Sequence, residues 1–503
     1  MLDFAVIGQG LSLLLELNVI VMLVLGLLFG TITGAIPGFS TPLAISVMLP
    51  LTFTMTPLVS IVFLTAVYAG GNFGSSISAI LLNIPGSPQA IVTGLDGYPL
   101  TRQGRAHEAL GTSVAASATG NLIGSLFLIL VMPLIVVVAL MFGPPEMFLV
   151  GVLGLVVIAA LHRSFLKAMI AGMFGVMVST IGMTSTGAIR GTHGYFELMD
   201  GIPVIPALVG LIGFSELYYM LQKAYVSEVR MPGRDWRGTW RQLMLGYRTT
   251  FSYPLALLRS SSIGVLIGAL PGAGATISSV VSYNEAHRAS RTPETFGKGS
   301  SEGLVSAESA NNASEGGALA LMLALGIPGG LATAVLIGAL MLQGLVPGPR
   351  LFLDEPELVY GVMLAQFLTS ALLLVVGLAV CFYAARIVNV TTAILIPLIA
   401  VFSIIGTYAI NLLMFDVVLM LIFAALGILL RRYDYPLIAV VLGLVLGPIL
   451  DQQLLRVHQT FGEVDLQIFL NRPVSAVLLI ILAVSVVPFV LRLLGFVRRN
   501  GSR

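Results

Sequence analysis

The chain has few charged residues for its length. Lys, Arg, Asp and Glu make up 10% of its 503 residues, whereas 57% are hydrophobic and the mean hydropathy is +1.00. Soluble domains carry about 25% charged residues, so this composition excludes a soluble fold. Runs of about 20 apolar residues, long enough to cross a bilayer, recur at 17–36, 361–382, 392–408, 412–430 and 474–491. We therefore expect an all-α, polytopic integral membrane protein.

Residues that other kinds of chemistry need are also scarce. The single cysteine, Cys381, excludes an intramolecular disulfide, and a net charge of +2 gives no reason to expect a nucleic-acid partner. The sequence holds no H-E-x-x-H pair, no P-loop and no aspartate-rich metal motif. The five histidines are scattered near expected loops: His107, His162, His193, His287 and His458. We expect no enzyme active site, no metal site and no cofactor.

Basic residues gather in one polar stretch. Residues 222–259 contain seven Lys or Arg and two acidic residues. By the positive-inside rule this stretch faces the cytoplasm. It divides the chain into a first membrane repeat (1–221), a basic cytoplasmic connector (222–256) and a second membrane repeat (257–503).

Within the connector, aromatic and apolar residues recur at helical spacing among arginines. They are Trp236, Trp240, Leu243 and Tyr247. This spacing predicts an amphipathic helix in the membrane interface. A docking surface for a partner is the alternative.

The two halves resemble each other. GAIPG (34–38) matches GALPG (268–272), and NIPGSP (83–88) returns as GIPGG (326–330), with Asn72 ahead of one and Asn312 ahead of the other. The shared order predicts an internal duplication. The loop with Arg102 and Arg105 should lie inside, whereas the acidic loop at 354–357 should lie outside, which favours an inverted repeat.

Each half is interrupted twice by a Pro-Gly pair. Pro removes a backbone donor, and Gly permits unusual dihedral angles. A broken helix persists in hydrocarbon only where protein or a wet cavity satisfies its backbone. Matched breaks in two repeats are typical of transporter sites, because helix N-termini attract anions and freed carbonyls bind cations. We predict broken or re-entrant helices and about 11–13 transmembrane segments. For a single motif, ordinary kinking is the alternative.

Neutral polar residues surround the breaks, and they are the candidates for substrate binding. None of the four motifs contains Lys or Arg, so we expect helix ends and a co-bound cation, rather than an arginine, to neutralise an anionic substrate. The predicted substrate-binding residues are Pro37, Gly38, Ser40, Thr41, Asn72, Asn83, Pro85, Gly86, Ser87, Pro271, Gly272, Ala273, Gly274, Thr276, Asn311, Asn312, Pro328 and Gly329.

A carboxylate at membrane depth is a candidate functional group. Glu308 is the main candidate for the coupling cation, together with Ser75, Ser309 and Asn312. Glu302 and Glu315 lie in the same stretch. The alternative is that this polar stretch lies at the water interface, where carboxylates are common.

At these residues the chain resembles a known family, the large TctA-like membrane subunit of the bacterial tripartite tricarboxylate transporters. The resemblance covers nearly the whole chain. It is carried by GAIPG (34–38), SAILLNIPGSPQAIVTGLDGYPL (78–100), GALPGAGATIS (268–278), ESANNASEGGALALMLALGIPGG (308–330) and FDVVLMLIFAALGILLRRYDYPLIAVVLGLVLGP (415–448). The family's Pro-Gly and amide motifs fall on the residues named above, and its glutamate falls on Glu308.

The resemblance implies import of di- or tricarboxylates across the bacterial inner membrane, driven by Na⁺ or H⁺. It further implies a periplasmic solute-binding protein that delivers the substrate and a small four-helix membrane subunit, with membrane lipid around both subunits. An anion channel or an intramembrane enzyme is the alternative function.

Overall fold

The computed structural model describes residues 4–184, 186–222, 236–384, 392–462 and 464–493. Almost all of this described chain is helical. Its strands form a short antiparallel hairpin that pairs Gly182–Met183 (β1) with Ile189–Arg190 (β2), and the rest of the described chain consists of turns and loops. The expected all-α membrane fold is confirmed. Connector residues 223–235, with Lys223, Arg230 and Arg234, lie outside the described residues.

Eight of the described helical segments are long and apolar enough to cross a membrane. They are α2 (Leu17–Gly34), α4 (Pro57–Leu82), α6 (Ala106–Leu140), α7 (Pro144–Leu161), Val204–Gln222, α17 (Pro356–Phe382), α20 (Met414–Arg432) and α21 (Leu437–Phe461). The segment Val204–Gln222 combines α9 (Val204–Leu208), a π-helix η4 (Val209–Phe214) and α10 (Ser215–Gln222). A ninth span would join α11 (Trp236–Thr250) to α12 (Pro254–Gly268), which are bent by 76°.

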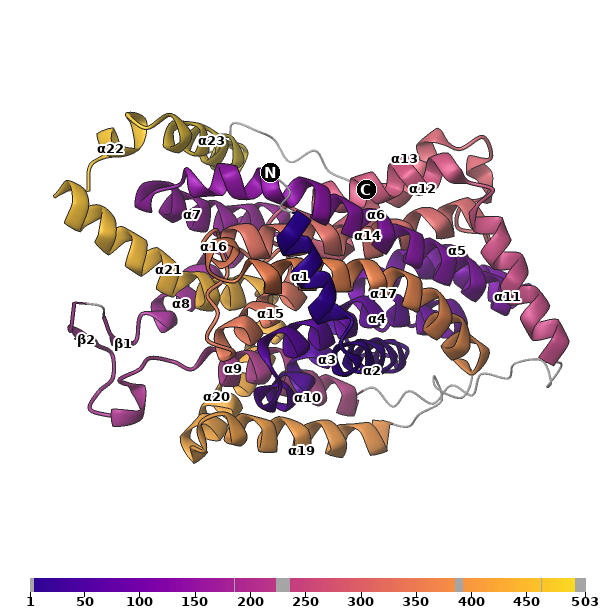
Figure 1. Ribbon diagram of the computed structural model, residues 1–503, viewed down its shortest axis with the longest axis horizontal. Helices are drawn as coiled ribbons and strands as arrows, with labels where there is room; N and C mark the ends of the chain where they lie inside the picture. Colours follow the sequence, from indigo (N-terminus) through magenta and orange to yellow (C-terminus); the bar gives the residue numbers. More distant parts are fainter. Residues whose placement is uncertain (1–3, 185, 223–235, 385–391, 463, 494–503) are drawn as a thin grey trace.

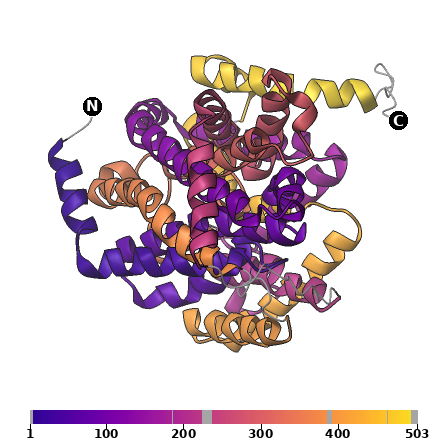
Figure 2. The same cartoon turned by 90° about the vertical axis from the view of Figure 1, so that its right-hand side faces the viewer.

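The sequence-based estimate of about 11–13 segments is higher because the chain also contains shorter apolar helices. These shorter stretches include α1 (Phe4–Leu14), α3 (Thr41–Met48) with the 3-10 helix η1 (Leu49–Thr54) that follows it, α8 (Phe165–Ser179) and α15 (Leu331–Leu342). They also include the parts Ile396–Asn411 of α19 (Thr392–Asn411) and Pro473–Val487 of α23 (Pro473–Leu493). In Figures 1 and 2, α19 and α23 lie at opposite edges of the bundle. The remaining described α-helices are α5 (Ile91–Arg102), α13 (Gly274–Ala289), α14 (Ser301–Leu325), α16 (Leu351–Asp354) and α22 (Leu466–Leu470).

Helices α4 and α14 form the centre of the bundle (Figure 1). Every residue of α4 from Val59 to Leu81 is buried, and so is every residue of α14 from Gly303 to Ala320. A helix buried on all sides belongs to the core of a large protein. The polar side chains of α14 from Ser306 to Glu315 therefore lie inside the protein.

Glycines allow both central helices to approach a neighbour at backbone distance. A β-carbon added at Gly34 of α2 would lie 2.5 Å from the carbonyl oxygen of Gly71 in α4, and one added at Gly268 of α12 would lie 2.1 Å from that of Ser314 in α14. The helix pairs α2–α4 and α12–α14 thus have the same contact. Because Gly34 corresponds to Gly268, their contact residues Gly71 and Ser314 also correspond. The next residues, Asn72 and Glu315, are therefore equivalent as well. The sequence alignment, which placed Asn72 opposite Asn312, is three residues out of register, nearly one helical turn.

The two halves are tied together by Asp96 of α5. Its carboxylate accepts hydrogen bonds from the backbone N–H groups of Gly299 (2.9 Å) and Ser300 (2.8 Å), just before α14, and from the Tyr283 hydroxyl (2.8 Å) of α13. Because these bonds bridge segments about 200 residues apart, α5 holds the first turn of α14 in place.

Helix α11 forms where the sequence predicts an amphipathic helix, and Figure 2 shows it in front of the bundle. Its buried face packs on α6: Leu243 is fully buried, and a β-carbon at Gly246 would lie 1.9 Å from the Glu108 carbonyl oxygen. Trp236 and Trp240 are 66% and 44% exposed. Trp236 also packs against the Phe382 ring of α17, with ring centroids 5.2 Å apart. The two tryptophans are therefore partly exposed, which is compatible with an interfacial helix.

Candidate functional site

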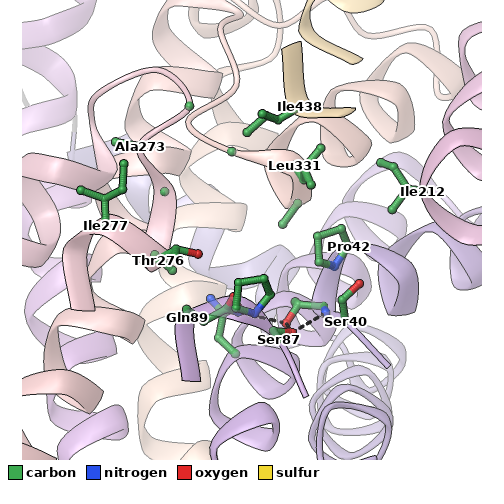
Figure 3. Close-up of a pocket in the computed structure, with 18 of the residues that line it drawn as sticks. Ser40, Pro42, Ser87, Gln89, Ile212, Ala273, Thr276, Ile277, Leu331 and Ile438 are labelled. Atoms are coloured by element: carbon green, nitrogen blue, oxygen red, sulfur yellow. Dashed lines mark hydrogen bonds between the residues drawn. The ribbon is translucent and has the colours of Figure 1, made fainter. Parts of the chain in front are cut away.

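All four Pro-Gly breaks meet at one cavity of about 590 Å³. The breaks join α2 to α3, α4 to α5, α12 to α13 and α14 to α15. In Figure 3, Ser40, Ser87 and Gln89 of the first half face Ala273, Thr276 and Leu331 of the second half. Two segment pairs far apart in the sequence therefore enclose a single space.

Four helical N-termini point toward this cavity. Its wall includes the first residues of α3, of the short 3-10 helix η2 (Pro88–Ala90) that leads into α5, of α13 and of α15. In the described structure none of the N-cap residues Ser40, Ser87, Ala273 and Gly330 caps its helix with a side chain. The first N–H groups of a helix have no intrahelical partner and carry partial positive charge. The cavity therefore suits an anion.

The left-handed backbone at the breaks explains the glycine content. Gly272 has φ +72°, and a β-carbon there would lie 1.9 Å from Cγ1 of Ile158, so only glycine fits. Gly326 ends α14 at φ +70°, and Asn83 ends α4 at φ +58°. Asn is the residue after Gly that best tolerates this conformation, so Asn83 terminates its helix as Gly326 does.

The structure brings most of the predicted substrate-binding residues to the cavity wall. These are Gly38, Ser40, Thr41, Asn72, Pro85, Gly86, Ser87, Gly272, Ala273, Gly274 and Thr276. The others do not line the wall: Pro37, Asn83, Pro271, Asn311, Asn312, Pro328 and Gly329. Gly329 instead permits close packing, since a β-carbon there would lie 2.7 Å from the carbonyl oxygen of Gly268.

The first break is fixed to the second by hydrogen bonds. The backbone N–H of Thr41 donates to the Ser87 hydroxyl at 3.0 Å. The Gln89 amide donates to the Asn72 side-chain oxygen at 2.8 Å. Gln89 and Asn72 both line the cavity, so this chain of contacts begins at its wall.

Glu315 continues that chain into the protein. Its Oε1 accepts from the side-chain amides of Asn72 (2.8 Å) and Asn312 (3.1 Å), and its Oε2 accepts from Gln366 (2.9 Å) of α17. Gln366 also donates to Asn121 of α6 at 2.8 Å. Glu315 is therefore separated from the cavity by a single side chain, Asn72.

Glu308, two turns earlier on α14, lies in a cage of hydroxyl groups. Its Oε1 accepts from Ser76 (2.7 Å) and from Thr93, and its Oε2 accepts from Ser113 (2.7 Å) and Ser117 (3.0 Å). These donors come from α4, α5 and α6. Of the other residues predicted for the cation, Ser75 hydrogen-bonds the Asn72 carbonyl at 2.8 Å, whereas Ser309 has no hydrogen-bond partner in the described chain.

Neither glutamate has a basic partner. Both are fully buried, and in the described part of the chain neither forms an ion pair. The side-chain oxygens of Asn311 and Asn312 next to them are buried without a hydrogen-bond donor among the described residues. Burying an uncompensated charge costs several kcal/mol, so these carboxylates call for a proton or a bound cation.

Several wall residues were not predicted from the sequence: Tyr68, Gln89, His162, Glu216 and Arg431. Arg431 lies on this wall, although we expected helix ends and a co-bound cation, rather than an arginine, to neutralise the substrate. That expectation considered only the Pro-Gly motifs, whereas Arg431 reaches the cavity from the last turn of α20. His162, which we expected near a loop, also lies on the wall. Arg431 lies within the segment 415–448 that carries the family resemblance. This was the one feature of the sequence that could have indicated a role for Arg431.

Comparison with known proteins gives two kinds of result. Residues 20–442 match the model of the family described as "Tripartite tricarboxylate transporter TctA family". An "Uncharacterized 52.8 kDa protein in TAR-I ttuC' 3'region" of Agrobacterium vitis is 35% identical over 96% of this chain and 95% of its own length. An "Uncharacterized protein in TAR-II ttuC' 3'region" of the same organism is 34% identical over 48% of this chain and 98% of its own. No solved structure matches.

Proposed function

The chain belongs to the tripartite tricarboxylate transporter TctA family, and on that premise we propose that it forms the pathway of a cation-driven carboxylate importer. Membership makes it a membrane subunit of a transporter. The substrate class, the coupling ion and the partners are the parts we propose.

The convergence of four helix N-termini on one cavity carries the proposal for the substrate. Each N-terminus contributes about 0.3–1 kcal/mol toward an anion, and up to ~2 kcal/mol where it is partly buried. Four of them acting together favour a compact anion with several negative oxygens. Hydroxyls from Ser40 and Thr276 on the wall supply donors for carboxylate oxygens. A di- or tricarboxylate of the citrate class fits this chemistry.

The two buried glutamates support coupling to Na⁺ or H⁺. Glu315 is hydrogen-bonded to Asn72, which lines the cavity, so a cation or proton at Glu315 would lie one residue from the substrate. Glu308 has four hydroxyl groups around its carboxylate, and hydroxyl and carboxylate oxygens are hard ligands that suit a small hard cation. Entry of the cation would neutralise the buried charge and stabilise the anion beside it.

A bacterial inner-membrane location follows from this proposal, with a periplasmic solute-binding protein and a small four-helix membrane subunit as partners. The term tripartite in the family description supports two further components. The exposed tryptophans of α11 support contact with membrane lipid at the cytoplasmic surface.

The test is uptake by proteoliposomes that contain this chain and its two partner proteins. Radiolabelled citrate, succinate and tartrate are supplied with sodium and proton gradients that are collapsed one at a time. We expect saturable accumulation against the substrate gradient that disappears when one of the two cation gradients is removed. Uptake that ignores both gradients would contradict coupling, and flux that only equilibrates the substrate would indicate the alternative, a channel.

A further inference from the structure

An ion pair on the cavity wall has no assigned part in transport. The Nη1 group of Arg431, in the last turn of α20, donates to Oε2 of Glu216, the second residue of α10. Both side chains line the cavity, and they are 28% and 18% exposed. The pair therefore joins two helices on the wall of the cavity.

The backbone around this pair is closely packed. Glu216 lies two residues after the end of the π-helix η4, and π-helical turns occur frequently at functional sites. A β-carbon at Gly210 of η4 would lie 2.2 Å from the Met420 carbonyl oxygen in α20, and one at Gly427 of α20 would lie 2.8 Å from that of Leu211 in η4. These contacts fix the spacing of the two helices, so the pair can open only through its side chains.

Arg431 has capacity for another ligand. A guanidinium group has five N–H donors, and in the described structure its one hydrogen bond uses Nη1. The Tyr219 ring lies 5.3 Å from its centre, a cation–π contact that holds it in place. Among the described lining residues, Arg431 is the one side chain with a permanent positive charge. It is the strongest carboxylate ligand on the wall.

We propose that a substrate carboxylate replaces the Glu216 carboxylate on Arg431. This inference rests on the proposed carboxylate transport. In the empty site, Glu216 neutralises Arg431 with the same functional group that the substrate carries. When the substrate binds, its carboxylate takes the guanidinium and Glu216 is released into the cavity. Glu216 is thus an internal competitor, and Arg431 selects planar carboxylates that can accept two parallel hydrogen bonds.

The exchange also removes the charged contact between α10 and α20. The bond between Arg431 and Glu216 links the two halves of the chain across the cavity wall. The bond is present in the empty site and absent when the substrate is bound. A ligand shifts a conformational equilibrium only through such a difference in interaction between two states.

The test is equilibrium binding of radiolabelled citrate to the purified full-length chain, with succinate and tartrate measured in parallel. Glu216→Gln removes the competitor, and we expect it to bind about fivefold to tenfold more tightly. Arg431→Gln removes a charge-assisted bidentate contact, and we expect it to bind about 10- to 100-fold more weakly. Arg432→Gln is the matched control, because Arg432 is exposed and does not line the cavity. It should bind as the unchanged protein does.

The charge-swapped double variant, Glu216→Arg with Arg431→Glu, separates binding from architecture. If the pair only holds the helices together, the swap restores citrate binding. If Arg431 receives the substrate, the swap leaves binding weak, because the arginine then projects from α10. Misfolding would weaken binding, so tighter binding by Glu216→Gln cannot come from misfolding. This variant therefore tests the proposal even if Arg431→Gln fails to fold. Wild-type levels of binding in both single variants would overturn this inference alone. A chain that binds none of the three carboxylates would overturn the proposed function as well.

Discussion

Glu308→Gln isolates the charge of the caged carboxylate from its shape. The amide that replaces it has the same size, and the four hydroxyls around Glu308 can act as donors or acceptors by rotating. Two can donate to the new carbonyl oxygen while the others accept from the new NH₂ group. At roughly 1 kcal/mol for each hydrogen bond, we expect the free energy of unfolding to change by no more than about 2 kcal/mol.

The effect on a bound cation should be much larger. Two unit charges 4 Å apart attract each other by about 4 kcal/mol at the effective dielectric of a protein interior. Loss of that attraction weakens cation binding about a thousandfold, because each 1.4 kcal/mol is tenfold. The variant should therefore enter the membrane and fold normally, yet need about a thousandfold more cation for half-maximal uptake.

The assay is citrate uptake by proteoliposomes as a function of Na⁺ concentration and, separately, of pH, beside a thermal unfolding curve of each purified protein. Glu302→Gln is the matched control, because Glu302 lies in the first turn of α14 and accepts from Ser290 at 2.6 Å, outside the cage. It should keep the cation dependence of the unchanged protein. Wild-type cation dependence in Glu308→Gln, with folding intact, would refute the assignment of Glu308 to the coupling ion.

Three further substitutions test the packing and the cavity. Gly268→Ala should lower the thermal unfolding midpoint, because its β-carbon would lie 2.1 Å from the Ser314 carbonyl oxygen. Gly8→Ala is the control and should leave the midpoint unchanged, because a β-carbon there has no atom within 4 Å. Equal midpoints for the two variants would contradict the close approach at Gly268. Asn83→Gly should keep near-normal uptake, since this residue caps α4 at φ +58° and lies off the cavity wall; complete loss would assign it a binding role. Asn72→Leu should reduce uptake at least about tenfold, because it removes two hydrogen bonds of roughly 1 kcal/mol each; unchanged uptake would show that the cavity and Glu315 act independently.

The breaks were predictable because their signal is local. Pro and Gly act on the backbone of their own segment, so Pro37-Gly38 and Pro271-Gly272 mark interruptions in any context. The helical membrane fold was predictable from the apolar composition and the long apolar runs, which also do not depend on tertiary contacts. The convergence of the four breaks could be proposed from their matched order, although the distance between them depends on tertiary packing.

The other residues of the cavity wall and of the glutamate sites could not be predicted, because they are brought together by contacts between segments far apart in the sequence. Arg431 sits at the C-terminal end of a helix, where a cation ordinarily complements the helix dipole, so nothing local distinguishes it from Arg432. Ser113 and Ser117 reach Glu308 from 195 and 191 residues away. The register of Asn72 was wrong because the match was made to another amide, Asn312. The offset of 243 residues between Pro85 and Pro328 places Asn72 opposite Glu315, as the structure does.

The glycine contacts of α2 with α4 and of α12 with α14 limit how the protein can move. Each pair meets backbone to backbone, with Gly34 against Gly71 and Gly268 against Ser314. A shift along either seam would drive a side chain into a carbonyl oxygen, so sliding is blocked and each pair must travel as a single rigid unit. In the proposed transport cycle, opening toward one side of the membrane and then the other would therefore occur between these helix pairs and not within them.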